Sequence, residues 1–471
     1  MQRQRRSRVR QHNAEYPSMP LPERQAWPAL IALCVGFFMI LLDQTIVAVA
    51  TPVLQESLQA SYNEVIWVTS AYLLTFAVPL LITGRLGDKF GPKNVYILGM
   101  IIFTLSSLAC GFAPNMTTLI IARAVQGLGA SLLTPQTMSV INRIFARNRR
   151  GAALGVWGTT AGLATLAGPT LGGLITSTIG WQWIFFINVP LGVVSVLAVA
   201  KWVPRFRPIE RSIDGLSMLL SVVAVASVIV ALQEGEREQW GWPIWVLLAF
   251  GFITAYAFVC QQARAEAASK EPLAPLELFS FRNFSLGNIG IAVMGFAVAG
   301  TPLPVMLYLQ QVHDYSALKA GLFMVPQALI SAVLSPFVGR LADRVSPGRL
   351  AAIGFSVLSL SFFLLGWSMT LGLAGGWFLG IMVIQGLGNS VIWAPNSTST
   401  MRDLPHALMG AGSGVYNTTR QVGSVVGSAA VGAVLQWRIS VADMGTAYGQ
   451  AIILAAAVLL IGAISSAAAK D

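Results

Sequence analysis

The sequence predicts an all-α polytopic membrane protein made of two related six-helix halves with two further helices inserted between them. Hydrophobic residues make up 55% of the 471 residues and charged residues only 10%, with a mean hydropathy of +0.68, whereas a soluble domain carries about 25% charged residues. Apolar runs of about 20 residues, the length that crosses a bilayer, recur along the whole chain. The chain also repeats itself.

Three motifs that recur in the same order define the repeat. Residues 155–173 match residues 414–432, and Gln-Gly-Leu-Gly at 126–129 recurs at 385–388, both 259 residues later. Gly-Arg-Leu-Gly-Asp at 84–88 returns as Gly-Arg-Leu-Ala-Asp at 339–343, 255 residues later. A duplicated membrane half is typical of secondary transporters, in which the substrate path runs between the halves.

Fourteen apolar segments account for nearly the whole chain. They lie at 28–50, 66–84, 94–113, 117–141, 151–175, 182–203, 213–232, 243–263, 285–309, 318–338, 350–368, 372–396, 408–435 and 447–467. Six spans with short loops need about 190–200 residues, so the repeat offset leaves about 60 residues for two extra spans. We therefore expect a tail at 1–27, an N-terminal half at 28–203, two inserted helices at 213–263 and a C-terminal half at 285–467.

The basic residues orient these spans. Alternate loops and the two ends hold 25 Lys and Arg residues, whereas the opposite loops hold three. Basic residues favour the cytoplasmic side, so we expect a multi-pass protein of a bacterial cell membrane with both termini in the cytoplasm. The net charge of +11 then reflects topology, and no nucleic-acid partner is expected.

The chain lacks the motifs of an enzyme. It has no nucleotide-binding P-loop, no His-Glu-x-x-His motif and no Ser/His/Asp set in a soluble domain. Cys34, Cys110 and Cys260 lie in apolar runs without the spacing of a metal site or disulfide pair. We expect no cofactor and no metal, and therefore an ion gradient as the energy source.

Four motifs carry a resemblance to a known family. They are Leu-Asp-Gln-Thr-Ile-Val-Ala-Val-Ala-Thr-Pro at 42–52, the glycine-rich loop at 84–93, Leu-Ile-Ile-Ala-Arg-Ala-Val-Gln-Gly at 119–127 and the Gly-Pro segment at 162–173. In this order the chain resembles the major facilitator superfamily, and in particular its fourteen-span bacterial drug–proton antiporters. Thr51, where that group usually has Leu, is a mild departure. The resemblance implies a major facilitator fold, alternating access, protons as the coupling ion, a membrane-embedded monomer and an amphipathic small-molecule substrate.

Asp43 is the only acid within the expected spans, and Arg123 is its candidate partner. An unpaired charge at this depth costs several kcal/mol. Asp43 lies about nine residues, roughly 13 Å, from the outer end of its span, and Arg123 about six residues, roughly 9 Å, so their depths are compatible. We expect Asp43 to couple transport to protons or to recognise a cation, and Arg123 to tune it. The alternative is a static structural ion pair.

The C-terminal copy differs from the N-terminal one at the charged positions. Arg123 aligns with Met382, and Ala161 aligns with Arg420. Arg420 lies near mid-membrane, and we expect a polar cluster there that faces a central cavity. The cluster consists of Asn417, Thr418, Arg420 and Gln421. Substrate contact and a bond between the halves remain equal alternatives.

The Gly-Pro segment and the glycine-rich loop are the remaining candidates. The segment contains Gly162, Gly168, Pro169, Gly172 and Gly173. These residues thin and bend a helix, which predicts a hinge and a tight seam between the halves; ordinary small-residue packing is the alternative. For the loop, the resemblance implies a conformational latch with Asp88 as its central acid, and a plain basic turn is the alternative. The latch residues are Gly84, Arg85 and Asp88, with Arg340 and Asp343 in the second copy.

These features predict proton-coupled export of amphipathic, often cationic compounds such as drugs. An exporter of an endogenous metabolite, lipid or siderophore would share the same features. A non-transporting membrane scaffold or sensor would need no charged residue in the membrane, so Asp43, Arg123 and Arg420 argue against it. The Gly-Pro segment disfavours a proton-driven importer.

Overall fold

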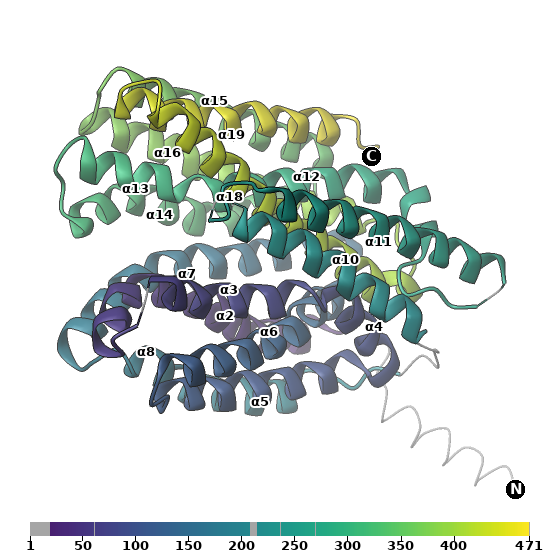
Figure 1. Cartoon of the computed structure of the whole chain (residues 1–471). Helices are drawn as coiled ribbons and strands as arrows, with labels where there is room; N and C mark the ends of the chain where they lie inside the picture. Colours follow the sequence, from purple (N-terminus) through teal and green to yellow (C-terminus); the bar gives the residue numbers. More distant parts are fainter. Residues whose placement is uncertain (1–18, 61, 208–213, 236, 269, 471) are drawn as a thin grey trace, which may run out of the picture.

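The computed structural model describes residues 19–60, 62–207, 214–235, 237–268 and 270–470, and all regular structure in these ranges is helical. Figure 1 shows two stacked layers of helices, one formed by α2 to α9 and the other by α12 to α19. The inserted helices α10 and α11 lie along one side of the upper layer and reach the groove between the layers.

The N-terminal half begins with the 35-residue helix α2. Its helices are α2 (Glu23–Ser57), α3 (Tyr62–Ala77), α4 (Leu80–Phe90), α5 (Pro92–Gly111), α6 (Met116–Ile144), α7 (Arg150–Thr178), α8 (Trp183–Phe186) and α9 (Asn188–Trp202). Gly91, at φ 83°, ends α4, and Pro92 starts α5, as the fixed φ of proline favours at a first helical position. The side chain of Asn115 caps α6 by accepting the Thr118 amide at 2.9 Å.

The C-terminal half repeats this order. Its helices are α12 (Arg282–Gly300), α13 (Pro302–Gln311), α14 (Ala317–Ala342), α15 (Pro347–Thr370), α16 (Gly376–Ser390), α17 (Trp393–Met401), α18 (Met409–Ile439) and α19 (Met444–Ala467). Ser346 and Asp443 cap α15 and α19. A core of apolar side chains from α12, α15, α16, α18 and α19 holds the half together.

The inserted pair consists of α10 (Gly215–Glu234) and α11 (Trp242–Ala267), which pack against each other. Asp214 caps α10 by accepting the Ser217 amide at 3.1 Å. On its other face α10 contacts α3 of one half and α18 of the other, through a small cluster that includes Val78, Ile229 and Val425. The insertion therefore bridges the two halves.

Twelve helices or helix pairs in the described chain are long and apolar enough to cross a membrane, and the bent pair 67–77 and 80–90 makes thirteen. The fourteen spans expected from the sequence are therefore not confirmed as a count. The expected segment 151–175 is the 29-residue helix α7, which packs between α2 and α14. Its glycines and threonines make it less apolar than the helices counted, so apolarity alone does not identify it as a span.

The halves meet near one end of the bundle, where α4 and α6 end and α7 and α18 begin. We call this the basic end, and the opposite end the open end. At the basic end the first half of α7 lies against α14, and α4 lies against α18. A Cβ on Gly155 would lie 2.5 Å from the Ser335 carbonyl oxygen, and one on Gly84 would lie 2.7 Å from the Gly410 carbonyl oxygen. Only glycine permits backbones to approach this closely.

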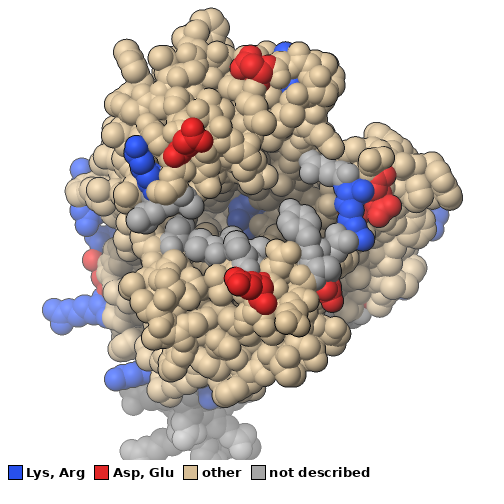
Figure 2. Space-filling view, turned by 60° about the vertical axis from the view of Figure 1, so that its left-hand side comes forward, with Lys and Arg blue, Asp and Glu red and all other residues tan. Residues whose placement is uncertain are grey.

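These two seams are related by the sequence repeat, because Gly414 beside Gly84 is the repeat partner of Gly155. Figure 2 views the open end, where the surface is hollowed between the halves. Acidic and basic side chains both lie around the mouth of the hollow, and a basic side chain lies at its floor. The protein is therefore closed at the basic end and hollow at the open end.

Candidate functional site

The Asp43 carboxylate and the Arg123 guanidinium form an ion pair inside the N-terminal half. Arg123 Nη1 lies 2.5 Å from Asp43 Oδ2, and both side chains are fully buried. Asp43 comes from the middle of α2 and Arg123 from the first half of α6. The structure thus brings together the two residues that the sequence placed at compatible depths.

Neutral amide groups complete this site, which we call the charge cluster. The other Asp43 oxygen, Oδ1, accepts hydrogen bonds from Gln126 Nε2 at 2.8 Å and Asn188 Nδ2 at 3.0 Å. Arg123 also donates to Gln126 Oε1 at 2.7 Å and to the Val68 carbonyl at 3.2 Å. The Tyr72 ring covers the guanidinium, with its centroid 4.2 Å from Cζ, within the range of a cation–π contact.

The sequence analysis missed Gln126, Asn188 and Tyr72 as members of the charge cluster. Gln126 could have been found, because it follows Arg123 by three residues and so lies on the same helix face. Asn188 stands as a single amide within an apolar run, which is also a signal. Nothing in the sequence marks Tyr72, because an aromatic residue in a span is ordinary.

This geometry determines what a proton would do at Asp43. Oδ1 is occupied by two amide donors, so an added proton would compete for Oδ2, where Arg123 binds. Protonation would leave Arg123 buried without a counter-ion, which is strongly unfavourable in a low-dielectric interior. The charges of Asp43 and Arg123 are therefore interdependent, because each residue is the counter-ion of the other.

The first copy of the predicted latch packs tightly at the basic end. Asp88 accepts a hydrogen bond from Arg143 Nη2 at 2.7 Å, and the Arg85 Nη1 atom lies 3.8 Å from its other oxygen. Arg85 Nε also donates to the Leu273 carbonyl at 2.8 Å, and its Nη2 donates to the Pro272 carbonyl. Residue 85 therefore ties the N-terminal half to the linker that follows α11.

The second copy bridges the halves directly. The Asp343 carboxylate accepts the backbone N–H groups of Gly151 at 2.7 Å and Ala152 at 2.9 Å, at the start of α7. An acid here satisfies free amides and the positive end of the helix dipole. Burial nevertheless raises the pKa of Asp343, while the two amides lower it. Arg340 is exposed, so in this copy the acid makes the contact.

The predicted hinge residues of α7 do not all lie at the seam between the halves. Gly162 lies at the seam, where a Cβ would meet the Ala332 Cβ at 3.1 Å, whereas Gly168 packs against Thr45 of α2 within its own half. Gly172 is buried, and Gly173 borders open space. The side chain of Pro169 lies outside the described part of the structure. The tight seam on α7 is formed by residues 151–162, closer to the helix start than expected.

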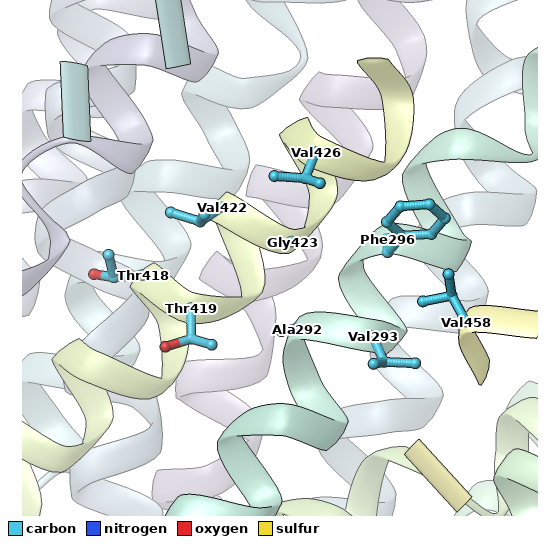
Figure 3. A pocket seen from close by; sticks show the side chains of 9 residues that line it. All are labelled: Ala292, Val293, Phe296, Thr418, Thr419, Val422, Gly423, Val426 and Val458. Carbon is cyan, nitrogen blue, oxygen red and sulfur yellow. The ribbon is translucent and has the colours of Figure 1, made fainter. Parts of the chain in front are cut away.

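The polar cluster predicted on α18 does not share one face. Asn417 and Gln421 follow Gly410 and Gly414 at helical spacing, so they lie on the side turned toward the N-terminal half. Asn417 donates to the Ser413 carbonyl at 2.9 Å. Thr418 instead lines a side pocket of about 370 Å³ between α12, α18 and α19, shown in Figure 3. Arg420 is partly exposed, and it makes no ion pair within the described residues.

The side pocket is almost entirely apolar. Its other lining residues are Ala292, Val293, Phe296, Thr419, Val422, Gly423, Val426 and Val458. Glycines 423 and 427 of α18 abut the α12 backbone beside it. The predicted substrate cluster is thus divided between this pocket, through Thr418, and the opposite side of α18, which carries Asn417, Arg420 and Gln421.

Comparison with known proteins gives consistent results. The model of the Major Facilitator Superfamily matches residues 33–428. The chain is 44% identical over 417 residues, 88% of this chain and 72% of the relative, to the Mycobacterium tuberculosis protein named "Uncharacterized MFS-type transporter Rv1250". It is 31% identical to the tetracenomycin C resistance and export protein of Streptomyces glaucescens, covering 88% of this chain and 76% of the relative. It is 30% identical to the riboflavin transporter RibZ of Clostridioides difficile, covering 86% of this chain and 87% of the relative.

Solved structures support the same fold. The human organic anion transporter MFSD10 superposes with a TM-score of 0.68 at 15% identity, covering 93% of this chain and all of that one. At this identity the likeness concerns the fold alone.

Proposed function

Because the chain belongs to the major facilitator superfamily, and so is a multi-pass transporter and not an enzyme, we propose that it is a proton-coupled exporter of amphipathic small molecules. In this proposal it works by alternating access in the bacterial cell membrane, with the basic end and both termini in the cytoplasm. It would belong to the fourteen-span drug–proton antiporters, with α7 as the span that apolarity alone does not identify.

The observation that carries the proposal is the Asp43–Arg123 pair in the charge cluster. A membrane protein retains a fully buried charge pair at a desolvation cost of several kcal/mol per ion, so a role beyond packing is the simplest reason for it. A proton arriving at Asp43 Oδ2 displaces Arg123, and the resulting unpaired charge favours rearrangement of α2 and α6. The closed basic end and the hollow open end correspond to one of the two states that alternating access requires.

The relatives support export but leave the compound open. One of them is named as a tetracenomycin C resistance and export protein, and another as a riboflavin transporter. An exporter of an endogenous metabolite is the second candidate, and the name of the second relative, which states no direction of transport, favours a metabolite as the compound.

Inverted membrane vesicles test the proposal. An ATP-driven proton pump acidifies the vesicle interior, and uptake of amphipathic fluorescent dyes is followed with and without a protonophore. We expect uptake that requires the acid interior and that falls at least tenfold in Asp43→Asn. The control variant Asp443→Asn should behave like the wild type, because Asp443 caps α19 outside the charge cluster and Asn is an equally good cap. Undiminished proton-driven uptake by Asp43→Asn would refute the assignment.

A further inference from the structure

Arg420 is a cation in the membrane-spanning part of the C-terminal half, and the described residues give it no counter-ion. It is the twelfth residue of the 31-residue helix α18. Its side chain is partly exposed, and within the described residues no Asp or Glu oxygen lies within 4 Å of it. Arg123, by contrast, is fully buried against Asp43. Of the two arginines near mid-membrane, Arg123 is therefore buried in an ion pair and Arg420 is partly exposed without one among the described residues.

Polar side chains flank Arg420 along its own helix, and two of them, Asn417 and Ser424, donate to carbonyl oxygens of α18. Ser413, Asn417 and Ser424 lie seven, three and four residues away, on the same or the adjoining strip of α18. The buried Ser413 Oγ has no hydrogen-bond partner among the described residues. A cation and a free hydroxyl on one strip form a site that accepts an oxygen anion.

The charge balance of the interior points the same way. Among the described residues of the spans, Asp43 is the only acid at this depth. Both of its carboxylate oxygens already bind partners, which are Arg123, Gln126 and Asn188. A cationic compound at this depth would thus meet Arg420 with no free carboxylate among the described residues to receive it, and like charges across a binding site repel. An anionic compound would supply the missing counter-ion.

We propose that the compound carried is an organic anion, an amphipathic molecule with one deprotonated acid group, which Arg420 binds through that group. The inference rests on the proposed function, because it names the class of compound that the exporter carries. It replaces the cationic substrate expected from the sequence.

Two dyes of one scaffold and opposite charge test the substrate class. Fluorescein is anionic and rhodamine 123 is cationic, and both carry a xanthene ring. In acidified inverted vesicles we expect the wild type to take up fluorescein faster than rhodamine 123. Arg420→Gln should lower fluorescein uptake at least tenfold, and Arg420→Lys should restore most of it. Arg402→Gln, which removes a cation at the end of α17, is the matched control and should keep the preference.

A second measurement tests the local electrostatic potential near Arg420, and it does not require either dye to be a substrate. Ser424→Cys, in a chain without the three native cysteines, places a thiol four residues from Arg420, about 6 Å along the helix axis and inside the Debye length of about 8–10 Å. We compare its reaction rates with anionic sulfonatoethyl and cationic trimethylammonium-ethyl methanethiosulfonates, each divided by the rate for a free thiol. Arg420→Gln should lower the anionic-to-cationic ratio at least threefold, and Arg420→Lys should preserve it.

The outcomes separate the two proposals. Proton-driven uptake that favours rhodamine 123, or a thiol ratio unchanged in Arg420→Gln, overturns the anion inference and leaves the exporter standing. Loss of all proton dependence for both dyes counts against the exporter, and the thiol ratio still decides whether Arg420 presents its charge to the hollow.

Discussion

Replacing Gly155 with alanine should open the basic end of the protein. A Cβ at this position would lie 2.5 Å from the Ser335 carbonyl oxygen and 3.1 Å from the Gly339 Cα. Ordinary contact begins at about 3.4 Å, so α7 and α14 must separate by about 0.9 Å. Both neighbours are backbone atoms, which cannot rotate away as a side chain can.

The size of the effect follows from overpacking. Inserting a methyl group into a packed seam costs about 1–3 kcal/mol, and every 1.4 kcal/mol is a factor of ten in an equilibrium. The cost applies only while the basic end is closed, because the new methyl group is free once the helices part. We therefore expect the closed population to fall relative to the open one by about 5-fold to 150-fold.

Pulsed electron paramagnetic resonance measures this population directly. Spin labels at Asn94 and Arg349, both exposed at the basic end, should give a longer-distance component in Gly155→Ala. The matched control is Gly173→Ala on the same helix, where a Cβ meets nothing within 4 Å. Both variants gain the same helix propensity. If the two variants gave the same distance distribution, the seam would not control closure.

Three further changes test other contacts. Asn188→Leu removes a donor to the buried Asp43 oxygen and should lower the free energy of unfolding by about 1–3 kcal/mol, seen as a lower melting temperature in detergent. Burial raises the pKa of Asp343 in the closed state. Closure is therefore stabilised below the ordinary pKa of the carboxyl and loses this stability as the pH rises through the raised pKa. Asp343→Asn should abolish this pH dependence in the distance measurement. Arg85→Gln removes charged hydrogen bonds to two linker carbonyls and should speed trypsin cleavage at Lys270, whereas unchanged cleavage would show that the linker is held by other contacts.

The inserted helices acquire a structural role from these contacts. Helix α10 packs on α3 and α18, and the linker after α11 accepts hydrogen bonds from Arg85. Movement of the latch must therefore be accompanied by movement of the linker. The sequence located this insertion through the repeat offset but gave no indication that it joins both halves, because its contacts are made by ordinary apolar residues such as Ile229.

The sequence determined the helical membrane architecture and the candidate ion pair. Long apolar runs must form helices in lipid, because every backbone polar group needs an internal partner there. A lone acid and a lone arginine at compatible depths must also find each other or pay a high desolvation cost, so Asp43 and Arg123 could be paired from their positions. The repeat could also be identified from the sequence, because matched residues recur at a nearly constant spacing.

Only the tertiary structure decided how these parts are used. Helix periodicity restricts residues to a face but does not say which neighbour that face meets, so the split of Thr418 from Asn417 and Gln421 required the packing of α12 against α18. The seams at Gly84 and Gly155 depend on backbone approaches between segments more than 150 residues apart. The amides of Gln126 and Asn188, and the absence of an ion pair at Arg420 within the described chain, likewise arise where helices meet. Local sequence specifies which residues can be buried, whereas the partner that each buried charge receives is a property of the assembled fold.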